Sequence, residues 1–285
     1  MLLDPLLDFA FMRRALVGTL ALALSAPPLG VFLIQRRLAL IGDALGHAIL
    51  PGVAVGAALF GLSLAAMSAG GMFAGLAVML ASGALSRTGA LAEDASLAGL
   101  YLIALALGVA IVSLSSAQVD VLQLLFGSVL GVDDDALLLM ATTATLTLVS
   151  LAIMWRPLVI ETFDSGFLRA KGGRGAAWHL GFLVLVVLNL VAAFQALGTL
   201  MAVGLMMVPA LAARFVSATL GGRVVSACLI AMAAVFTGLL VSFHADVPAG
   251  PAVVLTAAVL WLAVMVAGPE GSLLARTLRR PHLAG

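Results

Sequence analysis

The chain has 285 residues, of which 64% are hydrophobic and only 9% are charged, and its formal net charge is +1. An average soluble domain carries about 25% charged residues, so this composition excludes a soluble globular fold, and the sparse charge excludes a nucleic-acid partner. The single cysteine, Cys228, excludes an intrachain disulfide.

Nine apolar runs are long enough, or nearly long enough, to cross a bilayer, which takes about 20 helical residues. In chain order they are Ala15 to Ile34, Ala44 to Gly61, Leu64 to Leu85, Ser96 to Leu114, Ala136 to Met154, Trp178 to Leu197, Thr199 to Phe215, Val224 to Phe243 and Pro251 to Ala267. We therefore expect an all-α, polytopic transmembrane helical bundle that forms one domain over residues 1–285.

A tenth apolar segment lies between the fourth and fifth runs. It extends from Val119 to Val132, and its apolar part, Val121 to Leu130, is too short to cross a bilayer. We predict a short re-entrant or partial helix here, because irregular backbone at membrane depth must be covered by protein.

The longest polar connection, residues 156–177, combines charged and apolar side chains. Apolar residues recur at helical spacing at Ile160, Phe163, Phe167 and Leu168. This pattern predicts a short helix that lies across one face of the membrane, and the alternative is an ordinary solvated loop.

The basic residues indicate an orientation. With nine crossings and an outside N-terminus, twelve of the 14 Lys and Arg residues lie on the cytoplasmic side, as the positive-inside rule requires. These twelve are Arg36, Arg37, Arg87, Arg156, Arg169, Lys171, Arg174, Arg214, Arg223, Arg276, Arg279 and Arg280. We therefore predict an outside N-terminus and a cytoplasmic C-terminus.

Asp43 and His47, in the second run, are the first candidate site. Residues four apart share one helical face, and counting about 1.5 Å per residue from Arg37 places them about 9 Å and 15 Å deep in a core about 30 Å thick. Ionisable groups at such depth usually face a cavity, a partner or a substrate pathway. A carboxylate and an imidazole can bind zinc or manganese; the alternative is a hydrogen-bonded pair that pins two helices.

His244 and Asp246 form a second candidate site at the outer end of the eighth run, before a turn rich in Pro and Gly. An imidazole and a carboxylate there could form an outer metal-binding or gating site. Alternatively, Asp246 caps the helix that begins near Pro248 or forms a hydrogen bond to the turn. In the sixth run, Asn189 and Gln195 are more typical of hydrogen bonds between helices than of metal ligands.

The sequence contains no phosphate-binding loop with its Gly-Lys-Ser or Gly-Lys-Thr end, and no nucleophile-elbow, zinc-protease or Cys-x-x-Cys motif. We therefore expect a protein that is not an enzyme and binds no prosthetic group. If ATP drives its activity, hydrolysis must occur on a partner subunit.

Five segments stand in this order along the chain: RRLALIGDALGHAILPGVAVG, EDASLAGL, VDVLQLLFGSVLGVDDDAL, ALGTLMAVGLMMVPALAARF and FHADVPAGPAVVL. In content and in order they resemble segments of the permease subunits of bacterial ABC importers for zinc and manganese, and the similarity covers about Arg36 to Leu262. The resemblance implies an inner-membrane permease that pairs with a second copy of itself. It also implies two cytoplasmic ABC ATPase subunits and an extracytoplasmic metal-binding protein as partners.

The resemblance also implies residue roles. Asp43 and His47 match the family's metal positions, whereas His244 stands where relatives often carry an aromatic residue. Residues 161–172 match the region that contacts the ATPase, although ETFDSGFLRAKG departs from the commoner acidic start and Ala-rich middle. The residues expected to couple to the ATPase are Glu161, Asp164, Phe167, Leu168, Lys171 and Gly172.

The imidazoles of His47 and His244 favour zinc over manganese as the transported ion. Two other functions remain open from the sequence. One is a secondary metal transporter or channel, which needs no ATPase. The other is an ABC permease for a metal chelate such as a siderophore, which would not need the Asp43–His47 pair.

Overall fold

The computed structural model describes residues 9–38, 40–61, 63–87, 93–114, 132–164 and 175–278, and all regular structure within them is helical. The helices are α2 (Ala10–Gln35), α3 (Ile41–Ala48), α4 (Leu50–Phe60), α5 (Leu64–Arg87), α6 (Glu93–Leu114), α8 (Asp134–Phe163), α10 (Gly175–Leu197), α11 (Thr199–Ala213), α12 (Leu220–Ala245), α13 (Ala249–Ala267) and α14 (Leu273–Leu278). The predicted all-α bundle is confirmed.

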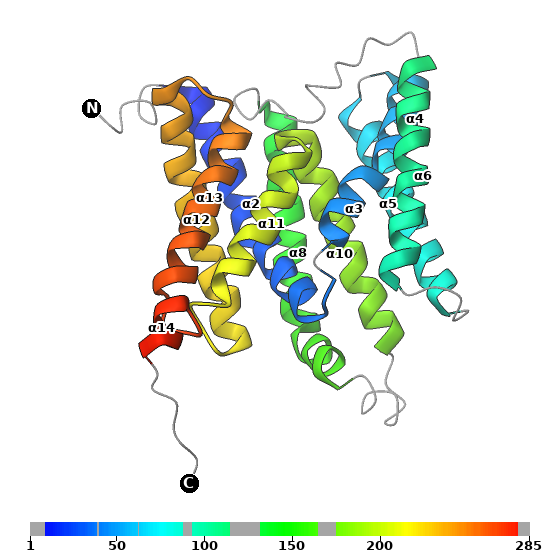
Figure 1. The fold of residues 1–285 in the computed structure, drawn as a ribbon. Coiled ribbons are helices and arrows are strands. Elements are labelled where there is room, and N and C mark those ends of the chain that lie inside the picture. Colours follow the sequence, from blue (N-terminus) through cyan, green and yellow to red (C-terminus); the bar gives the residue numbers. More distant parts are fainter. Residues whose placement is uncertain are drawn as a thin grey trace.

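Within the described residues, eight segments are long and apolar enough to cross a membrane, with α3 and α4 together forming one of them. The seventh predicted run, Thr199 to Phe215, differs from the expectation because its helix, α11, has only 15 residues. Gly198, at φ 83°, precedes this helix and a turn follows Ala213. In Figure 1, α11 nevertheless returns the chain from the end of α10 to the start of α12.

The predicted partial helix, Val119 to Val132, lies outside the described residues except for Val132. On either side of it, α6 ends and α8 begins at the same end of the bundle (Figure 1). The start of α2 and the short helix α14 lie at opposite ends (Figure 1).

The bundle is centred on α2 and α10, whose most apolar windows are both 72% buried. Helix α2 packs against α8, α11 and α12, and α10 packs against α8, α5 and α11. Figure 1 shows α12 and α13 along one edge and α4, α5 and α6 along the other. Helix α3 contacts α6, α10 and α11, so it lies between the edge formed by α4, α5 and α6 and the centre of the bundle.

Two close contacts fix this packing. Asn189 of α10 accepts a hydrogen bond from the Ser25 hydroxyl of α2 at 2.9 Å and donates to the Thr147 hydroxyl of α8, so its predicted role between helices is confirmed. Between α4 and α5, Gly52 and Gly70 let the two backbones approach so closely that neither position has room for a Cβ atom.

Candidate metal site

The second predicted span is divided into α3 and α4, and the site residues lie on the short first part. Arg37, at φ 61°, ends α2 in a left-handed conformation, and α3 begins four residues later. At the other end, Pro51 has no backbone N–H to donate to the His47 carbonyl, which explains the break at Ile49. Helix α3 is therefore an eight-residue element that is joined to α4 through Ile49, whose backbone stays in the helical region.

Asp43 and His47 lie on one face of α3, as their spacing predicts. The His47 Nε2 atom is 3.8 Å from the Asp43 Oδ1 atom, which is too long for a hydrogen bond. The opposite face of α3, including Ile41 and Leu45, is buried in the core. Within the described part of the chain, neither side chain forms a hydrogen bond to another helix. The observed geometry therefore differs from the alternative, in which a hydrogen-bonded pair pins two helices.

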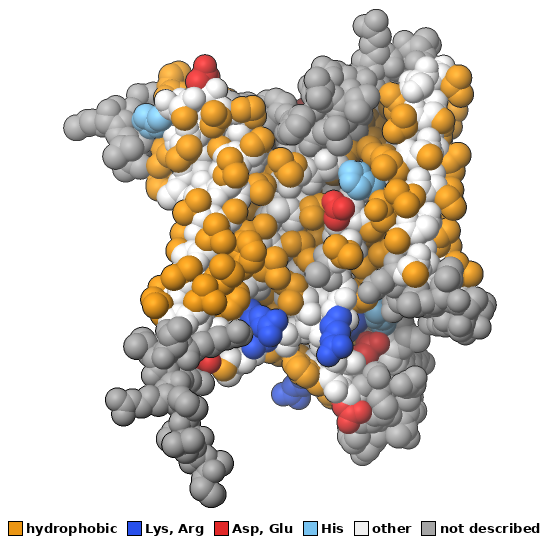
Figure 2. All heavy atoms as spheres, in the orientation of Figure 1, with side chains coloured by type: hydrophobic (Ala, Val, Ile, Leu, Met, Phe, Trp, Pro, Cys, Tyr) orange, Lys and Arg blue, Asp and Glu red, His pale blue; other side chains and the backbone are white. Residues whose placement is uncertain are grey.

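Both side chains face a cavity of about 370 Å³. Its lining residues are Asp43, Gly46 and His47 of α3, Thr199, Leu200, Val203 and Gly204 of α11, and Val254 of α13. The Asp43 side chain is 67% exposed and that of His47 29%. Figure 2 shows an acidic side chain and a histidine side by side over α3, in the otherwise hydrophobic middle of this face.

His47 is held in a defined orientation. Its ring stacks on Tyr101 of α6, with centroids 6.4 Å apart and planes at 27°. Its Nδ1 atom is buried and has no hydrogen-bond partner among the described residues, whereas Nε2 points toward Asp43. The imidazole therefore offers Nε2 to a ligand. The sequence analysis did not identify Tyr101 as a site residue, because no local pattern relates it to His47.

The arrangement provides one carboxylate and one imidazole nitrogen, a donor pair that suits divalent ions such as manganese and zinc. No group of three or more His, Cys, Asp or Glu side chains that could hold a metal occurs within the described residues. Two protein ligands and an open cavity fit an ion that binds and leaves better than a permanent structural metal.

His244 and Asp246, the second candidate site, do not line this cavity. His244 lies in the last turn of α12, where its Nδ1 atom is 2.8 Å from the Leu240 carbonyl oxygen. Asp246 is the C-cap of α12, at φ 52°. Pro248 is the N-cap of the next helix, α13 (Ala249–Ala267), and no side chain forms a cap hydrogen bond there, so the alternative in which Asp246 caps that helix is wrong. A role of His244 and Asp246 in metal binding stays a prediction.

Of the predicted coupling residues, only Glu161 and Asp164 are described. Phe167, Leu168, Lys171 and Gly172 lie outside the described residues. The Glu161 side chain is only 14% exposed and its Oε2 atom is 3.8 Å from an Arg36 Nη2 atom. It is therefore directed into the bundle, and the coupling of these six residues to an ATPase stays a prediction.

Comparison with known proteins places the chain in a family. The profile of ABC-3, the ABC 3 transport family, matches residues 8–268. The chain belongs to the ABC 3 transport family. This confirms the resemblance that the sequence motifs predicted, and it makes the chain the permease part of an ABC transporter.

Individual known proteins resemble the chain over nearly its full length. It is 29% identical to the manganese transport system membrane protein MntC of Halalkalibacterium halodurans, over 97% of this chain and 94% of that protein. It is 26% identical to the chelated iron transport system membrane protein YfeD of Yersinia pestis, over 90% and 86%. The solved structure of PsaBC from Streptococcus pneumoniae in complex with Fab matches with a TM-score of 0.86 and 27% identity, over 97% of this chain and 98% of that one.

Proposed function

We propose that this ABC 3 permease belongs to a bacterial importer for a divalent metal ion, and that Asp43 and His47 bind the passing ion. The observation that carries the proposal is a carboxylate and an imidazole, 3.8 Å apart, on the wall of an open cavity. The carboxylate offsets part of the cost of removing water from the ion, and Nε2 adds a directional ligand. A transported ion must be bound firmly enough to enter and loosely enough to leave.

Manganese is the first candidate ion and zinc the second. The relative MntC is named for manganese, and a mixed carboxylate and imidazole pair suits manganese as well as zinc. The expectation of zinc from the sequence depended on the imidazoles of both His47 and His244. Of these two side chains, only His47 lines the cavity.

A metal chelate is a further candidate substrate, because the relative YfeD is named for chelated iron. An organic ligand such as a chelate is usually bound in a pocket lined by apolar and aromatic side chains, with a few polar groups that fix its orientation. The cavity instead offers two ionisable side chains, Thr199, and small or aliphatic neighbours. These features favour a bare ion.

In the proposed complex, two copies of the permease assemble with two ABC ATPase subunits and an extracytoplasmic metal-binding protein. Arginines at the ends of α2 and α11 and at the start of α12 lie at the end of the bundle opposite Arg14. In Figure 2, the arginine side chains visible on this face gather at this lower end. The positive-inside rule then places this end in the cytoplasm and the N-terminus outside, in the bacterial inner membrane.

The proposed mechanism is alternating access. ATP binding closes the ATPase subunits, residues 156–177 transmit the movement, and the cavity beside α3 opens to one side of the membrane at a time.

Ion uptake by site variants tests this function. A deletion strain that expresses Asp43→Asn or His47→Ala should import manganese at least about tenfold more slowly, because each variant removes one of two ligands. The variants should reach the membrane in normal amounts and co-purify with the ATPase. His244→Ala, assayed in parallel, separates the two candidate sites. Normal growth of the His47→Ala strain under both manganese and zinc limitation would exclude the assigned site.

Transport in proteoliposomes separates the ABC importer from a secondary transporter or channel. Uptake of manganese by the complete complex should require ATP, and uptake driven by an ion gradient without ATP would support the alternative. Parallel assays with manganese, zinc and a ferric chelate identify the substrate.

A further inference from the structure

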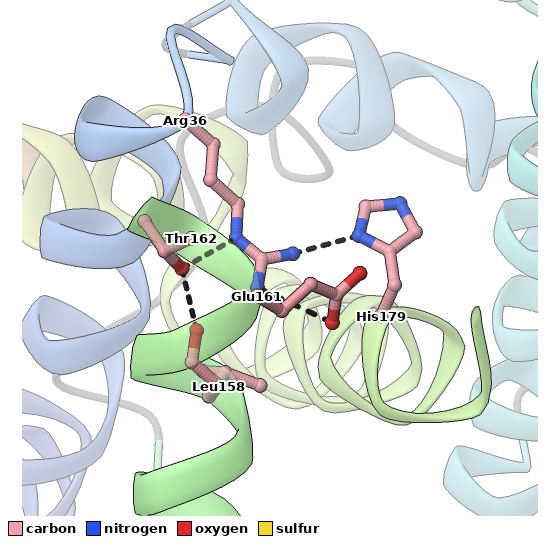
Figure 3. A network of polar contacts seen from close by, with 5 residues as sticks. All are labelled: Arg36, Leu158, Glu161, Thr162 and His179. Carbon is pink, nitrogen blue, oxygen red and sulfur yellow. Dashed lines mark hydrogen bonds and ion pairs between the residues drawn. The ribbon is translucent and has the colours of Figure 1, made fainter. Parts of the chain in front are cut away.

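Arg36 lies at the centre of a polar network that the metal site does not use. The residue caps α2, and its side chain is only 8% exposed. Figure 3 shows it reaching between α8 and α10, where Thr162, Glu161 and His179 surround the guanidinium group. Buried arginines are costly unless they are paired and hydrogen-bonded.

Each guanidinium nitrogen faces a defined partner. Nε donates to the Thr162 hydroxyl at 3.1 Å, and that hydroxyl donates to the Leu158 carbonyl at 2.7 Å. Nη1 donates to His179 Nδ1 at 2.7 Å, and Nη2 is 3.8 Å from Glu161 Oε2. The guanidinium carbon also lies 4.8 Å from the centre of the Phe182 ring.

The hydrogen bond to His179 fixes the protonation of that ring. Arginine has donors only and stays charged in proteins, so Nδ1 of His179 must be the acceptor. The imidazole is therefore neutral and carries its proton on Nε2. Arg36 and Glu161 are then the two opposite charges of the network. Removal of either side chain leaves the charge of the other less well neutralised.

The position of the network connects two parts of the proposed transport machinery. Glu161 and Thr162 lie in the last turn of α8, where the predicted coupling region 161–172 begins, and His179 and Phe182 lie in the first turns of α10, the helix that follows this region. Arg36 lies in the short connection between α2 and α3, seven positions before Asp43. One guanidinium group thus joins both helices that flank the coupling segment to the connection that leads into α3.

Resting on the proposed function, we propose that Arg36 is a positioning residue that couples ATP hydrolysis to metal movement. Its contacts make the ends of α8 and α10 move together with the α2–α3 connection, so a displacement of the coupling segment changes the position of Asp43 and His47. Without these contacts, the ATPase can still turn over and the site can still bind metal, but the two events no longer depend on each other.

The test uses the complete complex, purified with its ATPase subunits and reconstituted in proteoliposomes. Three quantities are measured: manganese imported, ATP hydrolysed, and manganese bound by the nucleotide-free complex. For Arg36→Gln we expect hydrolysis and binding within about twofold of wild type. Manganese imported per ATP should fall about tenfold, within the roughly 5- to 150-fold range that coupling between sites ordinarily spans.

Further variants separate coupling from stability. Arg36→Lys keeps a charge near Glu161 but lacks the forked guanidinium group that can bind Thr162 and His179 together. It should therefore restore the amount of manganese imported per ATP only in part. Glu161→Gln should lower the ratio in the same direction, and it decides the test if Arg36→Gln cannot be purified. The matched control is Arg37→Gln, an exposed neighbour of Arg36 whose loss removes the same charge.

Three results would overturn the inference. The first is an unchanged amount of manganese imported per ATP in Arg36→Gln, or in Glu161→Gln when that variant decides the test. The second is an equal decrease of this amount in Arg37→Gln. The third is a joint loss of binding, hydrolysis and thermal stability, which would indicate a purely structural role. Failure of the wild-type complex to import manganese or zinc with ATP would instead refute the proposed function.

Discussion

The contact between Gly52 and Gly70 gives the sharpest test of the packing. A Cβ atom on Gly52 would overlap the Gly70 carbonyl oxygen, and it would lie 2.5 Å from the carbonyl carbon and 2.7 Å from the Ala74 Cβ atom. Ordinary contact begins at 3.4 Å, so α4 and α5 must separate by at least 3.4 minus 2.5, or 0.9 Å, to accept Gly52→Ala. Overpacking of this kind typically costs about 1–3 kcal/mol.

The assay is reversible unfolding of the purified permease in mixed micelles, with Gly83→Ala as the matched control. Gly83 is also helical, on α5, but a Cβ atom there would meet nothing within 4 Å. We expect Gly83→Ala to be neutral or to stabilise the protein by up to about 1 kcal/mol, because alanine favours helix more than glycine does. Equal stabilities of Gly52→Ala and Gly83→Ala would show that the two backbones are not in contact as described.

Two further predictions concern single polar residues. Asn189→Leu should lower the free energy of unfolding by about 1–2 kcal/mol, because it removes the hydrogen bonds to Ser25 and Thr147 between helices; a melting temperature equal to wild type would contradict this. Asp246→Gly should raise the free energy of unfolding by up to about 1 kcal/mol, since its φ of 52° strains a side chain that glycine lacks. A loss of manganese uptake in Asp246→Gly would instead support the outer metal site.

Local patterns in the sequence were sufficient to locate Asp43 and His47 on one helical face. Helical periodicity fixes that relation whatever the rest of the chain does. The cavity that they face was not predictable, because its other walls, on α11 and α13, reach it through packing between helices that are distant in the sequence. For the same reason the neighbours of His47 could be found only in three dimensions.

Arg36 shows a second limit of sequence reasoning. As a basic residue at the end of an apolar run it indicated only the side of the membrane. Its partner Thr162 is 126 positions away, and no periodic pattern relates the two. The length of α11 was also overestimated, because hydropathy does not register the turn that follows Ala213.

The division of the second span has a mechanical consequence. An eight-residue helix is about 12 Å long, so pivoting α3 by about 20° about its centre moves its ends by only about 2 Å, whereas the same pivot of an unbroken 20-residue span would move them by about 5 Å. Arg37 turns the chain sharply before α3, and Pro51 removes one backbone hydrogen bond after it, so α3 is held less rigidly than a helix that continues unbroken into both neighbours. A small displacement of the α2–α3 connection can thus re-aim the ligand-bearing turns without a wide sweep of the helix ends.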